Sequence, residues 1–427
     1  MSVSRNRLNN AELALNGRMA NKLTRPQARN SMVANLSERK NTGENEMKML
    51  RVSFFGSIAA IICAVALLAV SAEVAVTKVR AATPLRSVAD SPIVAAGRAV
   101  PSGSKAPGPS GYHLLKKIPL GGEGFWDYIT FDPATRRLYI SRGTRVVVLE
   151  VDSGKTAGEI PNTDGVHGIA LAPEFNRGFT SNGRAGTVTI FDLKTLNVIG
   201  NVQAGTNPDA IIYDPSSKRV FAMNGRSKNV TAIEAATGKV VGTIPVDGKP
   251  EFAVADGAGH VYVNIEDKSE EQVIDSQNLK VTATWPLKPC QEPSGLAMDI
   301  VHRRLFAGCD NKMMAVIDAD SGKVVATPEI GEGVDANAFD AELGYAYASN
   351  GESGTLTVVH EDSPDMYSVV ENVPTQAHAR TMALDPKTHQ VFLVTADFGA
   401  TPAATPDNAH PRPTMVKDSF VVLIFGK

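Results

Sequence analysis

Ionisable residues recur at one position of a repeated pattern in the carboxy-terminal three quarters of the chain. Several short apolar runs end in an Asp-Pro pair, as in residues 128–133, 210–215 and 381–386. Counting five residues back from the Asp of each such corner, or from its equivalent, gives one residue per repeat: Asp127, His167, Asp209, Glu251, Ser294, Asp335 and Arg380. Six of these seven side chains are ionisable, which predicts a polar site wherever the repeats converge.

Clustered carboxylates repel one another unless a cation or hydrogen-bond donors lie among them. Oxygen donors such as Asp209, Glu251 and Asp335 are typical ligands of Ca²⁺ or Mg²⁺, and adding His167 would admit Mn²⁺ or Zn²⁺. In an enzyme, His167 or Glu251 would act as the general base, while Arg380 would stabilise an oxyanion or bind a substrate carboxylate.

The same positions also predict contacts to a polar ligand, from Asp127, Ser294 and Asp335. The alternative is structural. Side chains of this kind also hydrogen-bond to neighbouring loop backbones and to water, and would then fasten adjacent repeats to each other.

A second group of polar residues follows the next strand of each repeat. We expect Asn182, Asn224 and Asn350 to lie at the same end of the molecule as the first group and to contribute to ligand binding. Several of them precede Gly, and Asn tolerates left-handed backbone, so turn formation is the alternative role.

The chain has three cysteines and no Cys-x-x-Cys pair, which argues against zinc ribbons, iron–sulfur centres and c-type haem. Cys290 precedes one predicted strand and Cys309 ends the next, so both reach the same end of a repeat. In an oxidising compartment they are expected to form a disulfide, and two buried thiols are the alternative.

The strands and turns that carry these residues recur about every 42 residues from residue 112 onward. A turn of the type in residues 152–155, 236–239 and 320–323 precedes a β-branched run, and an Arg begins strands such as 137–141, 219–223 and 304–308. Each repeat thus supplies four short strands separated by turns. Seven repeats predict an all-β, seven-bladed β-propeller over 112–427, closed by the amino-terminal strand joining the last blade.

These repeated segments resemble the YVTN-repeat, YncE-like family of exported bacterial β-propellers, and residues 261–264 come closest to the motif that gives the family its name. The resemblance covers about residues 112–427. It implies export and a seven-bladed ring, and it implies no single chemistry. One member of the family is known as a DNA-binding protein.

Residues 397–419 form an insertion of about 20 residues in the last repeat, and the insertion contains four prolines and His410. Long connections inside a compact fold are commonly functional or disordered. We interpret this one as a lid over the same end of the ring, to which His410 could contribute.

The amino-terminal part has the layout of an export segment. Residues 52–72 are uncharged and mostly apolar, and they follow Lys48 and Arg51. We therefore interpret 47–82 as a signal peptide or an uncleaved membrane anchor, and 83–111 as a flexible linker. Residues 1–46 are a polar, basic tail, or are untranslated if synthesis starts at Met47 or Met49.

The net charge of the folded part of the chain limits the classes of partner that it can bind. Residues 83–427 carry 31 Lys and Arg against 40 Asp and Glu, which disfavours a nucleic-acid partner. The sequence predicts a periplasmic or otherwise extracytoplasmic propeller that binds a small polar ligand, a cation or a protein partner in an acidic central funnel. The alternative is a metal-assisted hydrolase or lyase of the lactonase type, and a DNA-binding propeller is a weaker third hypothesis.

Overall fold

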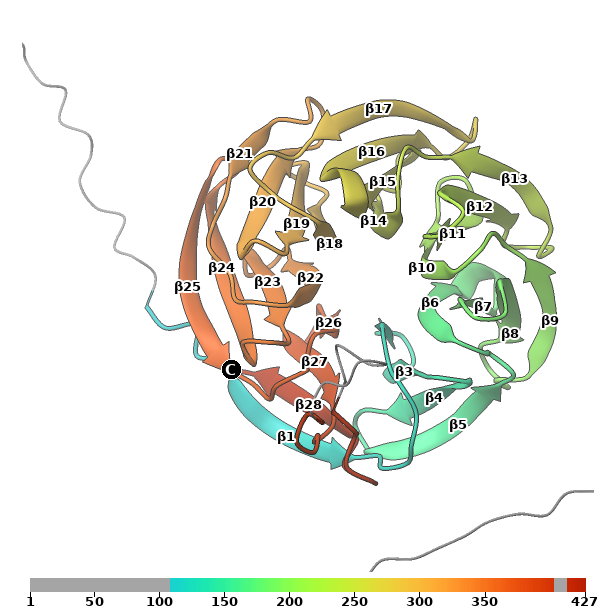
Figure 1. Cartoon of the computed structure of the whole chain (residues 1–427), viewed down its shortest axis with the longest axis horizontal. Helices are drawn as coiled ribbons and strands as arrows, with labels where there is room; N and C mark the ends of the chain where they lie inside the picture. Colours follow the sequence, from blue (N-terminus) through green and yellow to red (C-terminus); the bar gives the residue numbers. More distant parts are fainter. Residues whose placement is uncertain (1–107, 403–412) are drawn as a thin grey trace, which may run out of the picture. The chain divides into compact units, whose positions relative to one another are not determined.

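The computed structural model describes residues 108–402 and 413–427, which form a ring of seven four-stranded antiparallel sheets (Figure 1). This confirms the predicted all-β, seven-bladed propeller. The tail 1–46, the apolar segment in 47–82, most of the linker 83–111 and His410 lie outside the described residues. Among the described residues, no helix has the length and apolar character needed to cross a membrane.

Each blade is a sheet whose four strands follow one another from the centre of the ring outward. The first four blades are β2 (Ile129–Asp132), β3 (Arg137–Arg142), β4 (Arg145–Glu150) and β5 (Lys155–Pro161); β6 (Val166–Ala172), β7 (Arg177–Asn182), β8 (Thr187–Asp192) and β9 (Val198–Gln203); β10 (Pro208–Asp214), β11 (Arg219–Asn224), β12 (Asn229–Glu234) and β13 (Val240–Pro245); and β14 (Pro250–Ala255), β15 (His260–Ile265), β16 (Glu270–Asp275) and β17 (Lys280–Pro286).

The last three blades complete the ring. They are β18 (Pro293–Asp299), β19 (Arg304–Cys309), β20 (Met313–Asp318) and β21 (Val324–Ala326); β22 (Val334–Asp340), β23 (Tyr345–Asn350), β24 (Thr355–Ser363) and β25 (Met366–Pro374); and β26 (Met382–Asp385), β27 (Gln390–Thr395), β28 (Val421–Gly426) and β1 (His113–Pro119). Two single-turn 3₁₀ helices, η1 (Pro173–Phe175) and η2 (Glu266–Lys268), replace turns in the second and fourth blades.

The burial of each strand follows from its place in the blade. The second and third strands, such as β11 and β12, are buried along nearly their whole length because the neighbouring blades cover both faces. Outer strands such as β17 alternate between exposed and half-buried residues. Apolar side chains between adjacent sheets therefore form the core, and the ring holds it in seven separate clusters.

The amino-terminal strand closes the ring, as predicted. β1 pairs antiparallel with β28, with Leu114 opposite Phe425 and Pro119 opposite Val421. In Figure 1 β1 lies outside β28 as the outer strand of the last blade. Hydrogen bonds between β1 and β28 join the two ends of the described chain, so the last blade has four strands like each of the others.

Two recurring residues of the sequence pattern hold the blades in place. The Asp at the end of the first strand accepts backbone N–H groups of its own turn, as Asp214 does from Ser216 and Ser217. The Arg at the start of the second strand donates to carbonyls of the next blade. Arg219, for example, donates to the carbonyls of Ser276 and Gln277 at 2.6 and 2.8 Å.

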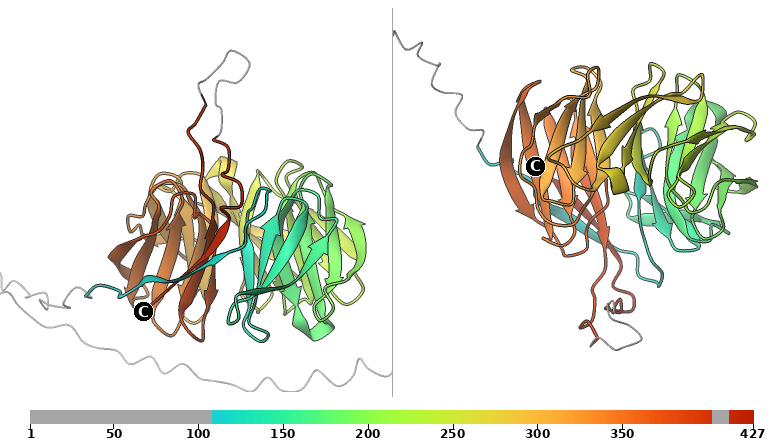
Figure 2. Two further views of the ribbon diagram at one scale, coloured as in Figure 1. Left: turned by 90° about the horizontal axis from the view of Figure 1, so that it is seen from below. Right: turned by 45° about the horizontal axis from the view of Figure 1, so that its top comes forward.

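The connection between β27 and β28 rises from one face of the ring (Figure 2). Its described parts pair with each other, since Phe398 and Met415 form an isolated bridge and Gly399 donates to the carbonyl of Thr414. We call this end of the ring, where first strands begin and second strands end, the mouth.

Candidate functional site

The seven residues counted back from the Asp corners all lie at the mouth, at or just before the start of the first strand of each blade. In five blades the register between the first and second strands shifts at this point, as between Pro208 and Ile211 opposite Asn224 and Ala222. Such a bulge places an extra residue in the strand and re-aims its side chain. In β10 the two residues inside the bulge are Asp209 and Ala210.

Three of these residues, from consecutive blades, converge on one point. His167 Nδ1 lies 2.6 Å from Asp127 Oδ2 and 3.4 Å from Asp209 Oδ1. Asp127 and Asp209 are buried, and the three donor atoms lie within 4.8 Å of one another. Gly183 leaves room for the imidazole, because a Cβ there would approach its Nε2 to 2.6 Å. We call Asp127, His167 and Asp209 the triad.

Arg380 links the triad to the sixth blade. Its Nη1 donates to Asp335 Oδ2 at 2.7 Å, and its Nη2 donates to Asp127 Oδ1 at 3.2 Å. Ser294 completes this part of the layer by donating its hydroxyl to Asp335 Oδ1 at 2.8 Å. The expected residues Asp127, Ser294, Asp335 and Arg380 thus form one continuous chain of contacts.

Glu251 lies in a separate part of the layer. The hydroxyl of Tyr128 donates to its Oε1 at 3.0 Å, and Lys249 Nζ lies 2.9 Å from its Oε2. Lys249 also pairs with Glu266 of η2. The repeated pattern did not predict Lys249, Tyr128 or Glu266, because all three lie outside the repeated position. Lys249 is the one with a sequence signal, two residues before Glu251.

The layer holds more acid than base. Five carboxylates, those of Asp127, Asp209, Glu251, Glu266 and Asp335, stand against Lys249, Arg380 and the imidazole of His167. Burial, followed by the charge of neighbouring carboxylates, raises the pKa of Asp209 to about 6 and that of Glu251 to about 8. Burial also raises the pKa of Asp335 despite the nearby Arg380.

The pKa of His167 is shifted in the direction opposite to the one that burial alone would produce. Desolvation alone would lower its pKa, but the hydrogen bond to Asp127 and the charges of Asp209 and Asp127 outweigh it, so the pKa of His167 is raised. The site therefore attracts positive charge, either as protons or as a cation.

Hydrogen bonds from the preceding blade fix the backbone of several site residues. Ser181 donates to the carbonyl of Asp209, Ser349 donates to that of Arg380, and Asn264 Nδ2 donates to that of Ser294 at 2.8 Å. These donors all occupy the same position in the second strand. They position the site residues, and the repeat of a small polar residue before the end of that strand is the sequence signal for them.

Metal binding was expected from Asp209, Glu251 and Asp335, but these three do not form a common donor set. Asp209 belongs to the triad, Asp335 pairs with Ser294 and Arg380, and Glu251 pairs with Lys249. The sequence pattern identified the layer but did not predict which members of it lie close enough together to share an ion.

The asparagines expected to bind ligand instead form hydrogen bonds inside their own blades. All three are completely buried. Asn182 donates to Thr187 and Thr189, Asn224 to Asn229 and Thr231, and Asn350 to Thr355 and Thr357. This geometry supports the structural alternative, in which they shape the turn between the second and third strands.

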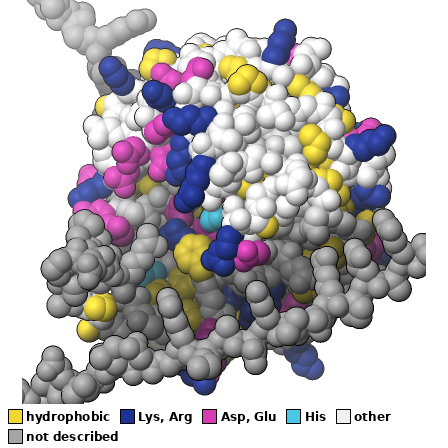
Figure 3. Space-filling model, turned by 45° about the vertical axis from the view of Figure 1, so that its right-hand side comes forward, with side chains coloured by type: hydrophobic (Ala, Val, Ile, Leu, Met, Phe, Trp, Pro, Cys, Tyr) yellow, Lys and Arg dark blue, Asp and Glu magenta, His cyan; other side chains and the backbone are white. Residues whose placement is uncertain are grey.

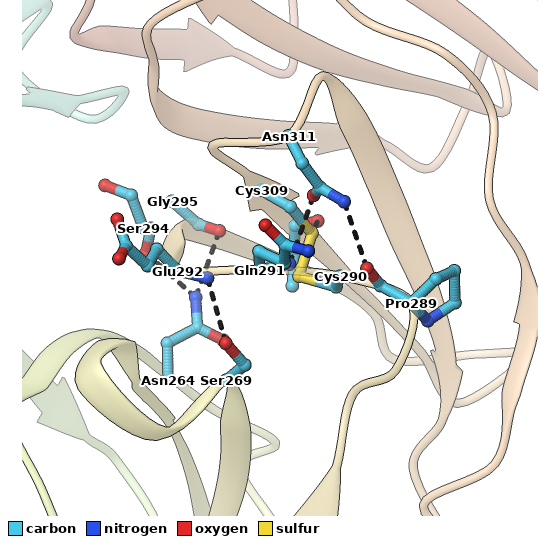
Figure 4. The surroundings of a disulfide bond; sticks show 11 residues. Asn264, Ser269, Pro289, Cys290, Gln291, Glu292, Ser294, Gly295, Cys309 and Asn311 are labelled. Carbon is cyan, nitrogen blue, oxygen red and sulfur yellow. Dashed lines mark hydrogen bonds between the residues drawn. A yellow bond between two sulfur atoms is a disulfide. The ribbon is translucent and has the colours of Figure 1, made fainter.

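Cys290 and Cys309 form a disulfide with 5.5 Å between their Cα atoms. Figure 4 shows it between the segment leading to Ser294 and the end of β19. Asn311 binds the same segment by donating to the carbonyl of Pro289 and accepting from the backbone of Gln291. The loop that carries Ser294 is therefore fastened to its own blade, and Asn264 fastens it to the preceding one.

Another histidine and two acids meet at the opposite end of the ring. His302 Nδ1 lies 2.7 Å from Asp299 Oδ2 and 3.1 Å from Glu361 Oε1. A histidine also contacts the corner aspartate in the fourth blade, where His260 Nδ1 lies 2.9 Å from Asp256. We therefore interpret this group as part of the turn structure.

Comparisons with known proteins support the fold and do not identify a family. No protein-family model matches the chain, and no curated protein sequence matches it. Among solved structures, a chain of hydrazine synthase from Kuenenia stuttgartiensis is similar, with a TM-score of 0.56 and 15% sequence identity. The similarity covers 72% of this chain and 98% of that chain. The fold and site define a seven-bladed β-propeller with an acidic layer at its mouth.

Proposed function

We propose that this propeller binds a divalent cation at the triad. The observation that carries the proposal is the convergence of Asp127, His167 and Asp209 from three blades, with donor atoms within 4.8 Å of one another. Two carboxylates with one imidazole favour Zn²⁺ or Mn²⁺, whereas Ca²⁺ and Mg²⁺ suit sites made of oxygen donors alone. Glu251 and Arg380 would contact what the ion holds.

Charge and rigidity both support this assignment. A cation would offset the surplus of carboxylates that otherwise forces Asp209 and Glu251 toward their protonated forms. Hydrogen bonds between blades, from Ser181 to the carbonyl of Asp209 and from Thr381 to that of Asp127, hold these donors in place before an ion arrives, so binding would need little reorganisation.

We further infer that the protein acts outside the cytoplasm. The Cys290–Cys309 disulfide supports this location, because such bonds persist in oxidising compartments. The apolar segment 52–72 provides the matching export or anchoring signal. DNA binding gains little support, since basic and acidic side chains lie side by side on the face that Figure 3 draws.

A metal-assisted hydrolase of the lactonase type is the second candidate function. Glu251 favours it, because its carboxyl is buried in the same layer as the triad and accepts a hydrogen bond from Tyr128. A protonated carboxyl in that place could deliver a proton to a leaving group.

The test is metal content of the full chain and of matched variants. We expect the wild-type protein to bind about one Zn²⁺ or Mn²⁺ per chain in a titration calorimeter, and D209N and H167A to lose that binding at least about tenfold. H302A, at the histidine of the opposite end, is the control and should bind as the wild type does. Retention of full stoichiometry and affinity by D209N would disprove the triad site.

The hydrolase is tested with a panel of lactones. Hydrolysis that requires the metal and is lost in E251Q would favour the enzyme.

A further inference from the structure

A pocket of about 810 Å³ opens at the mouth beside the acidic layer. It lies between the sixth, seventh and first blades and beneath the described parts of the β27–β28 connection. We call it the mouth pocket; its lining comprises Gly124, Phe125, Trp126, Gly333, Val334, Asp335, Gly351, Glu352, His378, Arg380, Phe398, Pro413 and Met415. Its volume suits a small organic molecule.

Three aromatic rings, those of Phe125, Trp126 and Phe398, and the imidazole of His378 line part of the mouth pocket. Trp126 packs against Phe398 with ring centroids 5.8 Å apart, and His378 packs against the other side of this cluster, 4.6 Å from Phe398. Phe125 is about half exposed at 51% although it is a large apolar side chain. The buried indole N–H of Trp126 has no acceptor among the described residues. Phe125 and the half-buried Phe398 therefore offer flat apolar surface to a ligand, whereas Trp126 is 6% exposed and contributes little surface of its own.

The floor and rim of the pocket are negative overall. Arg380 is the only lysine or arginine of the lining, and its guanidinium already contacts both Asp335 and Asp127. Glu352 adds a carboxylate at the rim, where its Cγ lies 2.5 Å from the place a Cβ of Gly333 would take. Arg142 is nearby but is 2% exposed and stacks on Phe420, so it offers the pocket almost no surface.

An anionic ligand would therefore meet a guanidinium whose charge two aspartates already balance. A cationic group would meet the exposed Glu352 and the half-exposed ring of Phe125, since Asp335 is already paired with Arg380 and Ser294. A carboxylate and the face of an aromatic ring both attract ammonium ions. We propose that the mouth pocket binds an organic ammonium ion with an aromatic or branched apolar body. The ammonium group faces Glu352, and the body packs against Phe125 and Phe398, next to Trp126.

This site is separate from the triad and does not depend on a bound metal. None of the three triad residues lines the mouth pocket, although Arg380 touches both sites. Binding measured in the presence of a chelator therefore tests the pocket alone.

The chain offers a direct reporter, because it contains two tryptophans, Trp126 in the pocket and Trp285 on the outer strand β17. In full-length W285F, fluorescence reports on Trp126 alone. Three probes of similar shape differ in charge: 2-phenylethylamine, 2-phenylethanol and 3-phenylpropionate. With EDTA present, we expect saturable changes with the amine, at least about tenfold weaker binding of the alcohol, and still weaker binding of the carboxylate.

Substitution separates charge from shape. In the W285F background, E352Q should weaken the amine about tenfold while leaving the alcohol unchanged, since only the ammonium interacts with the removed charge. E342Q, at the exposed Glu342 of the opposite end of the blade, is the matched control and should change neither. H167A should lose the metal and keep the amine. Equal or tighter binding of 3-phenylpropionate, or no saturable response to any probe, would overturn the proposal.

Discussion

Glu271 occupies a position that is aliphatic or Met in every other blade. It is the second residue of the third strand, where the other six sheets have Val146, Val188, Val230, Met314, Leu356 and Val422. Its side chain is completely buried, and neither carboxylate oxygen has a hydrogen-bond partner among the described residues. Burial raises the pKa of Glu271 well above its ordinary value, so the folded protein holds it protonated.

This predicts a specific pH dependence of stability. Above the ordinary glutamate pKa of 4.5, the unfolded chain releases the Glu271 proton while the folded chain keeps it. The contribution of Glu271 is thus fully present at low pH and is lost as the pH rises, by about 1.4 kcal/mol per pH unit. E271Q should remove that slope between about pH 5.5 and 7 in urea unfolding, and E271V should also raise the free energy of unfolding. An unchanged slope in E271Q would contradict this assignment.

The positions of the site residues were predictable, but their partners were not. The count from the Asp corner placed all seven counted residues at the mouth, because each lies the same number of residues before the corner of its blade. Pairing depends on side-chain length and direction across the ring. Arg380 and Asp127 are 253 residues apart in the chain. Lys249 also escaped prediction, since no other repeat has a lysine or arginine two residues before the counted position.

The arginines at the start of the second strands act between blades. Arg137, Arg177, Arg219 and Arg304 each donate to a backbone carbonyl near the end of the third strand of the next blade. The repeated arginine, which in the sequence marks only the start of a strand, thus holds neighbouring sheets together. We call this contact the clamp.

We predict that R219A lowers the free energy of unfolding by about 1–3 kcal/mol, because two carbonyls lose a charged donor. R184A is the control. Its side chain is 74% exposed and pairs only with Asp164, so we expect a change below about 0.5 kcal/mol. Urea unfolding of the two variants beside the wild type measures both values. Equal effects of the two substitutions would show that the clamp contributes little.

Most elements could be predicted because each blade repeats the same strands and turns. The period, the Asp corners and the amino-terminal closing strand were enough to define seven sheets and their order. The bulges in strands such as β10 could not be predicted, because they depend on the register with the neighbouring strand and not on a residue type. These bulges nevertheless decide where the side chain of Asp209 points.

The whole ring is what assembles the site. Asp127, His167 and Asp209 come from three blades, and Arg380 and Asp335 come from two more. Each blade contributes one of the seven counted side chains, and only closure of the circle brings Arg380 beside Asp127. The acidic surplus is therefore a property of the complete propeller, and so is the cation binding that we propose.

Anomalous X-ray scattering from crystals of the full chain grown with Zn²⁺ or Mn²⁺ would locate the cation that we propose at the triad. We predict one strong peak at the mouth, within about 2.0–2.3 Å of Asp127, His167 Nδ1 and Asp209. We also predict that D209N loses this peak. A peak at Asp299, His302 and Glu361 instead, or metal-soaked crystals in which His167 still donates to Asp127 with no ion beside it, would contradict the account.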